Sequence, residues 1–269
     1  MDLHTNGRVQ NGANYKLNEG IHMKIGILGA GSIGATLARK LSGAGHEVKV
    51  ANSRGPETIN PEIVAAGARA VEATDVVTDV DALIISIPLS RIPAIKPLIA
   101  NLPADAVIVD TSNYYPTRDG QVQALDDGQV ESVWITEQLG RPVAKAWNAI
   151  VAGSFEAKGK AAGDPDRIAI PIAADREADK AVAVSLVEDT GFDAFDAGSL
   201  ADSWRQQPGA PAYCTDLTRQ EIPEALAAAK KDRISQRRDL AMAAISEKLE
   251  TGATLTSDDV VEVNRAIYI

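Results

Sequence analysis

The sequence predicts an α/β protein with a doubly wound, mostly parallel sheet and a helical C-terminal extension. Short apolar runs alternate with helical stretches from Lys24 onward, which is typical of parallel strands joined by crossover helices. Several runs, such as Leu83-Ile84-Ile85, are apolar at every position, as in strands covered by helices on both faces. After Asp196 the alternation gives way to turns and, from about Leu217, to alanine-rich, charged helices.

Composition and charge limit the class of protein. A chain of 269 residues with 45% hydrophobic and 24% charged residues can bury a full core. Its net charge of −10 disfavours nucleic acid and anionic membrane surfaces as partners. Charged residues and prolines interrupt the most apolar stretch, 82–102, so we expect no membrane span. The single cysteine, Cys214, excludes an internal disulfide and multi-cysteine metal sites, which favours a reducing cytoplasm.

Three segments follow from these patterns. Residues 1–22 are rich in Asn and Gly and lack apolar periodicity, so we interpret them as a disordered leader or a segment added for expression. Residues 23–200 carry the alternating pattern of the main domain. Residues 201–269 form a loop and the helical extension.

The elements of the main domain are placed by their apolar runs and their boundary residues. A helix is expected from Asp175 to Thr190, with Asp175 as its N-cap and Gly191 in the C-cap position. The predicted strands are Lys24–Leu28, Glu47–Ala51, a weaker Ala68–Val71, Ala82–Ile87, Ala106–Asp110, Val143–Trp147, Ile168–Ala173 and Phe192–Asp196.

A glycine-rich turn joins the first strand to the first helix. The sequence Gly29-Ala30-Gly31-Ser32-Ile33-Gly34 has the G-x-G-x-x-G spacing of a dinucleotide-binding turn. Gly29 permits the turn, Gly31 allows a pyrophosphate to approach the backbone, and Gly34 allows close packing of helix and strand. The helix N-terminus adds N–H donors and a positive dipole. This context predicts a Rossmann-type domain over residues 23–200.

The end of the second strand indicates which dinucleotide binds. NAD enzymes usually carry an acidic residue about 20 residues beyond the turn, where it binds the ribose 2′-hydroxyl. Here the sequence is Asn52-Ser53-Arg54, with a hydroxyl donor and a guanidinium that can pair with an additional phosphate. We therefore predict NADP rather than NAD.

The catalytic groups of common dehydrogenases are missing. His4 and His22 lie in the predicted leader and His46 lies in the turn before the second strand, so a histidine general acid is not expected. No tyrosine of the main domain stands four residues before a lysine, and one cysteine cannot support a zinc alcohol site. What remains is hydride transfer to an acceptor such as a flavin-like ring, catalysed mainly by positioning.

Taken in order, four segments resemble the coenzyme F420-dependent NADP oxidoreductase family and the cytoplasmic reductase domain of the related metalloreductases. They are the glycine turn, Asn52-Ser53-Arg54-Gly55-Pro56, Ile87-Pro88 and Lys145-Ala146-Trp147-Asn148. The resemblance continues through Asp196-Ala197-Gly198 and covers about residues 24–200. Trp147 departs from the smaller aromatic residue or histidine expected before Asn148, and the helices after Leu217 extend beyond the short family members.

The resemblance implies roles for individual residues. Ala30, Gly31, Ser32 and Ile33 would wrap the pyrophosphate, Ser53 and Arg54 would hold the 2′-phosphate, and Ile87 and Pro88 would line the path to the nicotinamide. Together with their neighbours, the predicted cofactor-binding residues are Gly29, Ala30, Gly31, Ser32, Ile33, Gly34, Asn52, Ser53, Arg54, Ser86, Ile87, Pro88 and Ala146. The implied activity is hydride transfer between NADPH and a deazaflavin (coenzyme F420), flavin or similar small-molecule acceptor.

Two alternatives stay open. Lys145 and Asn148 stand three apart where a strand ends, and they are the candidates for polarising a hydroxyacid or imine substrate. A non-catalytic NADPH-sensing protein would use the same pocket without turnover. The residues considered for lining an acceptor pocket are Ser86, Ser112, Asn113, Lys145, Trp147 and Asn148.

The C-terminal helices favour a homodimer. Small alanine faces, as in 225–229 and 241–244, alternate with apolar residues and suit close helix packing between subunits. The same pattern would also let these helices fold back over the sheet of their own subunit.

Overall fold

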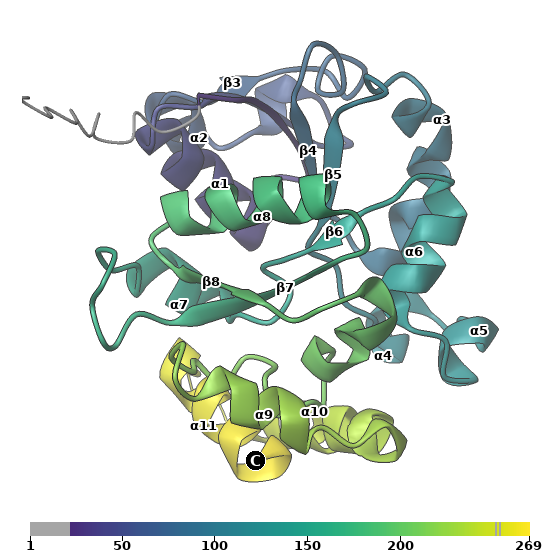
Figure 1. Ribbon diagram of the computed structural model, residues 1–269, viewed down its shortest axis with the longest axis vertical. Helices are drawn as coiled ribbons and strands as arrows, with labels where there is room; N and C mark the ends of the chain where they lie inside the picture. Colours follow the sequence, from purple (N-terminus) through teal and green to yellow (C-terminus); the bar gives the residue numbers. More distant parts are fainter. Residues whose placement is uncertain (1–21, 251, 253) are drawn as a thin grey trace, which may run out of the picture.

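The computed structural model of the chain describes residues 22–250, 252 and 254–269. Its strands form one eight-stranded sheet in the order β3-β2-β1-β4-β5-β6-β7-β8 (Figure 1). All but one residue of the predicted leader lie outside the described residues.

The sheet is parallel except between β6 and β7, which confirms the predicted fold class. The strands are β1 Lys24–Leu28, β2 Glu47–Ala51, β3 Arg69–Ala70, β4 Ala82–Ile85, β5 Val107–Asp110, β6 Ala144–Lys145, β7 Ala169–Ala174 and β8 Asp193–Asp196. Five strands, β3, β4, β5, β6 and β8, are shorter than predicted. β4 ends before Pro88, which has no N–H for a ladder, and β6 ends before Trp147, whose φ of 54° turns the chain away.

Helices cover both faces of the sheet. The α-helices are α1 Ser32–Gly43, α2 Pro61–Ala65, α3 Lys96–Ile99, α4 Pro116–Asp119, α5 Gln123–Asp126, α6 Glu131–Leu139, α7 Ala152–Ala157, α8 Glu177–Asp189, α9 Ile222–Ala228, α10 Ile234–Glu250 and α11 Ser257–Tyr268. The 3-10 segments are η1 Pro56–Thr58, η2 Leu89–Ile95, η3 Leu200–Gln206 and η4 Lys231–Arg233. One apolar cluster lies under α1 and α8, and a second lies under η2, α3 and α6.

The start of α8 differs from the prediction. Its N-cap is Arg176, and Asp175 stands one residue too early to accept from the first free N–H groups of the helix. The Asp175 carboxylate accepts instead from the N–H of Leu200, at 2.9 Å. The predicted end is confirmed, because Gly191 follows the helix with a φ of 90° and donates to Glu188 O.

The C-terminal helices pack on their own chain. α9, α10 and α11 gather at the end of the molecule opposite β3 (Figure 1). Tyr213 and Cys214 pack with Ala241 of α10 and with Val263 and Tyr268 of α11 in a separate apolar cluster. The C-terminal helices therefore fold back on their own subunit, which is the arrangement that the sequence left open beside a dimer interface.

Candidate functional site

A pocket of about 730 Å³ lies at the carboxyl ends of β1, β2 and β4. β1 pairs with β2 on one side and β4 on the other, so the chain winds in opposite directions from this point. Ligands of open α/β sheets bind at such a switch point. The pocket is lined by Leu28, Gly29, Ala30, Gly31, Asn52, Ser53, Arg54, Ala73, Ser86, Ile87, Pro88, Arg91, Ala94, Ile95 and Leu98.

The three glycines of the turn have different surroundings. A Cβ on Gly29, whose φ is 114°, would lie 2.1 Å from Ser86 O. A Cβ on Gly34 would lie 2.0 Å from Gly29 O. A Cβ on Gly31 would meet no atom within 4 Å. The outer glycines thus allow the backbone to pack closely, whereas the middle glycine leaves open space beside the helix start, which fits a pyrophosphate.

The N-terminus of α1 points free donors at this space. Gly31 is its N-cap and supplies no side chain to cap it. Within the described residues, the backbone N–H groups of Ser32, Ile33 and Gly34 find no acceptor. Free N–H groups and the helix dipole together favour a bound anion.

A short turn after β2 presents the hydroxyl and guanidinium groups. Asn52 Oδ1 accepts from the N–H of Arg54 at 2.8 Å, and Asn52 Nδ2 donates to Thr58 Oγ1 at 2.9 Å. These bonds fix the turn while Ser53 and Arg54 remain exposed beside the pocket.

The pocket is positively charged in a chain that is acidic overall. None of its lining residues is acidic, although the chain has 37 Asp and Glu residues. The side chains of Arg54 and Arg91 both line it, and neither has a hydrogen-bond or ion-pair partner among the described residues. Two unpaired guanidinium groups and a free helix N-terminus suit a ligand with several phosphates.

Most of the predicted cofactor residues meet in this pocket. Nine line it directly, namely Gly29, Ala30, Gly31, Asn52, Ser53, Arg54, Ser86, Ile87 and Pro88. Ser32 and Ile33 lie in the first turn of α1, and Gly34 provides the close contact described above. Ala146 is not brought to the pocket, because it is fully buried in the core under α1 and α8.

Sequence reasoning missed one wall of the pocket. Arg91, Ala94, Ile95 and Leu98 follow Pro88 through η2 and α3 and face the pocket together. Their i, i+3, i+4, i+7 spacing is that of one helical face and could have found them. Ala73, after β3, completes this wall.

The proposed acceptor residues are mostly buried. Lys145 has no exposed surface; its Nζ lies 2.6 Å from Asp110 Oδ2 and also donates to Ser112 O. Asn113 and Asn148 bond each other at 3.1 Å, and Asn148 Nδ2 also donates to Gln206 O. The structure therefore brings these residues together as internal contacts.

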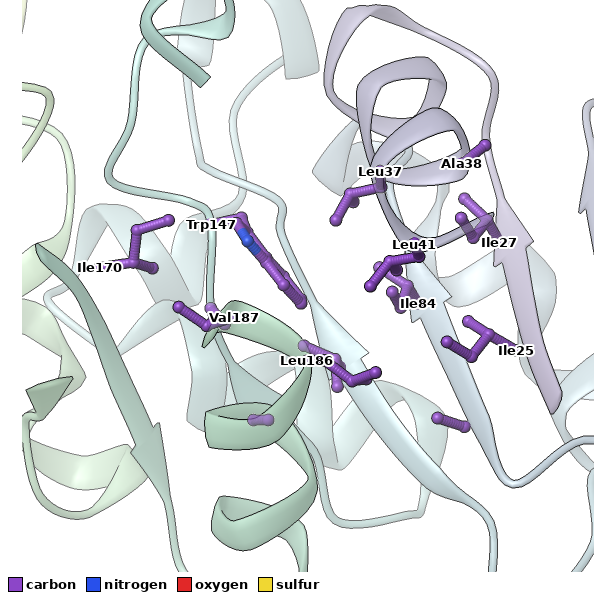
Figure 2. Close-up of a cluster of buried hydrophobic side chains, with 14 of the residues drawn as sticks. Ile25, Ile27, Leu37, Ala38, Leu41, Ile84, Trp147, Ile170, Leu186 and Val187 are labelled. Atoms are coloured by element: carbon purple, nitrogen blue, oxygen red, sulfur yellow. The ribbon is translucent and has the colours of Figure 1, made fainter. Parts of the chain in front are cut away.

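Trp147 points into the core. Its ring lies among Ile170, Leu186 and Val187 on one side and Leu37 and Leu41 of α1 on the other (Figure 2). It is 1% exposed. The open choice between a core aromatic and a stacking platform is thus decided for the core.

Other features carry no comparable site. A cavity of about 660 Å³ beside α7 and α11 has mixed charge, and its Lys158 is paired with Asp216 and Asp258. His46 is buried and bonds the N–H of Met23 and the carboxylate of Asp189. In the described part of the chain, no helix is long and apolar enough to span a membrane, and no three His, Cys, Asp or Glu side chains are grouped to hold a metal.

Comparison with known proteins identifies the family. Residues 24–114 match the family model described as NADP oxidoreductase, coenzyme F420-dependent. The Escherichia coli K12 protein YjhV is 38% identical over 105 residues, which are 39% of this chain and 74% of YjhV. The chain belongs to the coenzyme F420-dependent NADP oxidoreductase family. As a member of this family, it is an NADP-dependent oxidoreductase.

Solved structures share the fold. SMa0349, a hypothetical protein from Sinorhizobium meliloti, is 26% identical with a TM-score of 0.61, over 73% of this chain and 95% of that protein. A protein of Arthrobacter sp. FB24, proposed elsewhere to be an F420-dependent NADP reductase, is 22% identical with a TM-score of 0.51, over 67% and 87%. The 3-hydroxyisobutyrate dehydrogenase of Mycobacterium tuberculosis is 16% identical with a TM-score of 0.52, over 91% and 94%. The last two similarities concern the fold alone.

Proposed function

We propose that this oxidoreductase transfers a hydride between NADPH and a planar acceptor of the deazaflavin (coenzyme F420) or flavin class. Binding of NADPH is supported by the pocket, which has an uncapped helix N-terminus, two unpaired arginines and no acidic lining residue. The observation that favours a ring acceptor is the burial of Lys145, whose ammonium is already bound by Asp110 and Ser112.

The chain's own residues would position the cofactor. The N–H groups of Ser32 and Ile33 would bind the pyrophosphate, and Ser53 and Arg54 would bind the 2′-phosphate. Ile87 and Pro88 would lie beside the nicotinamide. When bound, NADPH supplies a hydride with two electrons, and the reduced acceptor takes one proton from solvent. Holding two rings at reacting distance is then the main contribution of the protein.

The alternatives make different demands. A hydroxyacid or imine dehydrogenase needs an accessible acid, and the Lys145 ammonium is enclosed. An NADPH sensor needs only the pocket. We propose a cytoplasmic location for each of these, because the only cysteine, Cys214, is buried and unpaired.

Steady-state oxidation of NADPH tests the proposal. Coenzyme F420, FMN, a series of 2-oxoacids and a series of imines are offered as acceptors, with NADPH binding measured separately. We expect turnover with the ring compounds. Turnover confined to oxoacids or imines would support the dehydrogenase, and tight NADPH binding without any turnover would support the sensor.

A further inference from the structure

The C-terminal helix α10 lies beside the segment that leaves β5. Tyr115, the residue before α4, packs against the apolar cluster that contains Ala241 of α10. Its hydroxyl lies 2.7 Å from the hydroxyl of Tyr213. The extension therefore reaches the carboxyl edge of the sheet, which is the edge where ligands of open α/β sheets bind.

A groove of about 390 Å³ runs between α4 and α10. Tyr115, Pro116 and Thr117 line one side, and Arg238, Asp239, Met242, Ala243 and Ser246 of α10 line the other. The groove thus has an aromatic ring, a flexible thioether and a guanidinium paired with the Asp239 carboxylate within one small space, which is a mixture that suits a ring-bearing ligand with a polar end.

The short helix α4 contacts both the groove and the segment that follows Pro88. Asp119, at the end of α4, accepts from the hydroxyl of Ser90 at 3.1 Å. Ser90 stands between Pro88 and Arg91, which line the cofactor pocket. The segment that lines the cofactor pocket is thus held against the helix that lines the groove.

Arg238 is the group in the groove that lacks a full set of partners. Its side chain is 11% exposed and its guanidinium lies 5.6 Å from the centre of the Tyr114 ring. Nε donates to Asp239 Oδ1 at 2.8 Å, whereas Nη1 and Nη2 have no hydrogen bond among the described residues. The Asp239 side chain is 66% exposed, so it neutralises this charge only weakly. A guanidinium held mostly out of water favours an anion that takes both free nitrogens.

We infer that the groove between α4 and α10 binds the anionic tail of a ring-bearing acceptor, with Arg238 as the ligand of its phosphate or carboxylate. This inference rests on the proposed function, since it assigns the acceptor's tail to this groove and its ring to the neighbouring cofactor pocket. It makes the C-terminal extension part of the acceptor site.

Matched pairs of ring compounds test the inference by direct binding to the full chain saturated with NADP⁺, followed by fluorescence. FMN and riboflavin differ by one phosphate, and coenzyme F420 and its deazaflavin core without the tail differ by an anionic tail. We expect the anionic member of at least one pair to bind about tenfold or more tightly. The pair that discriminates identifies the kind of tail.

Variants assign that preference to the groove. Arg238→Gln should abolish it and leave binding of the uncharged ring unchanged. Arg233→Gln is the matched control, because Arg233 is exposed and its side chain has no partner among the described residues. Ala243→Trp, at an exposed position of α10, should weaken binding of the anionic compound because the new side chain fills the groove. This variant tests the inference even if Arg238→Gln does not fold.

Two results would overturn the inference. One is equal binding of the charged and uncharged members of both pairs. The other is a preference that survives both Arg238→Gln and Ala243→Trp. NADPH binding, measured in the same samples, distinguishes failure of the proposed function from failure of the inference about the groove. If the wild type does not bind NADPH, the proposed function is refuted. If it does, only the inference about the groove fails.

Discussion

Lys145 Nζ lies 2.6 Å from Asp110 Oδ2, and neither side chain has any exposed surface. The two residues are register partners on β5 and β6, so the ion pair links the two strands at their carboxyl ends. Ser112 adds a hydroxyl that donates to Asp110 Oδ1 at 2.8 Å. This pair holds the edge of the sheet together.

Lys145→Met should therefore destabilise the protein strongly. It leaves the Asp110 carboxylate buried without its cation, which typically costs about 3–5 kcal/mol of the free energy of unfolding. Urea denaturation checks this. Lys24→Met is the control, because Lys24 pairs with Asp79 at the exposed surface and its loss should leave the midpoint almost unchanged.

The same Lys145 variant separates the two enzyme mechanisms. With ring-to-ring hydride transfer, turnover per folded molecule should change by only a few fold, because no side chain donates the decisive proton. A general acid contributes about 10²- to 10⁴-fold. A fall of about a thousandfold with NADPH affinity intact would therefore support the hydroxyacid or imine alternative.

Two glycine variants should separate binding from folding. Gly31→Ala places its Cβ in open space beside the helix start, so we expect a stable protein whose NADPH dissociation constant rises about tenfold or more. Gly34→Ala places its Cβ 2.0 Å from Gly29 O, so the backbone must shift and the unfolding free energy should fall by about 1–3 kcal/mol. Thermal melts and cofactor titrations measure both effects. Equal loss of stability in the two variants would contradict this division of roles.

Glu131 predicts a dependence of stability on pH. Burial raises the pKa of its carboxyl from 4.5 to about 7, and Oε2 has no hydrogen-bond partner. Lys145 and Arg238 oppose the shift, and Asp110 adds to it. The pKa of Glu131 is higher in the folded than in the unfolded protein, so the protonated carboxyl is the form that favours folding. Its contribution to the free energy of unfolding is complete below pH 4.5 and is lost as pH rises to about 7.

Glu131→Gln removes this titration. Between pH 4.5 and pH 7.5, the free energy of unfolding of the variant should rise by about 3 kcal/mol relative to that of the wild type. This value follows from a difference of about 2.5 between the folded and unfolded pKa of Glu131. Urea midpoints across this range give the measurement. A constant difference between the two proteins at every pH would refute a raised pKa for Glu131.

We also propose that the chain forms a homodimer through α10. Leu240 on this helix is 53% exposed, although the neighbouring face with Ala241 packs on its own chain. Light scattering should report a dimer for the wild type and a monomer for Leu240→Glu. A wild-type monomer at micromolar concentration would contradict the proposal.

Much of the cofactor site could be predicted from the sequence because its signals are local. The turn from Gly29 to Gly34 follows its strand directly, and Asn52, Ser53 and Arg54 follow the next one. Each of these segments reaches the pocket through its own strand end, so a parallel arrangement of these strands is enough to bring them together.

The acceptor side could not be predicted in the same way, because it depends on long-range pairing. The position of Lys145 at a strand end was correct, but its burial depends on Asp110, a partner 35 residues away. The groove could not be predicted for the same reason. Tyr115 and α10, which line it, are far apart in sequence and meet only after the chain has completed the sheet.

Titration of NADPH and NADH into the wild type and Arg54→Ala measures whether the pocket selects NADP through Arg54. The 2′-phosphate contact is absent from NADH, so NADPH should bind about ten- to a hundredfold more tightly, equivalent to about 1.5–3 kcal/mol. In Arg54→Ala most of this preference should disappear while the NADH affinity stays the same. Equal affinities of the wild type for the two cofactors would show that the pocket does not select NADP.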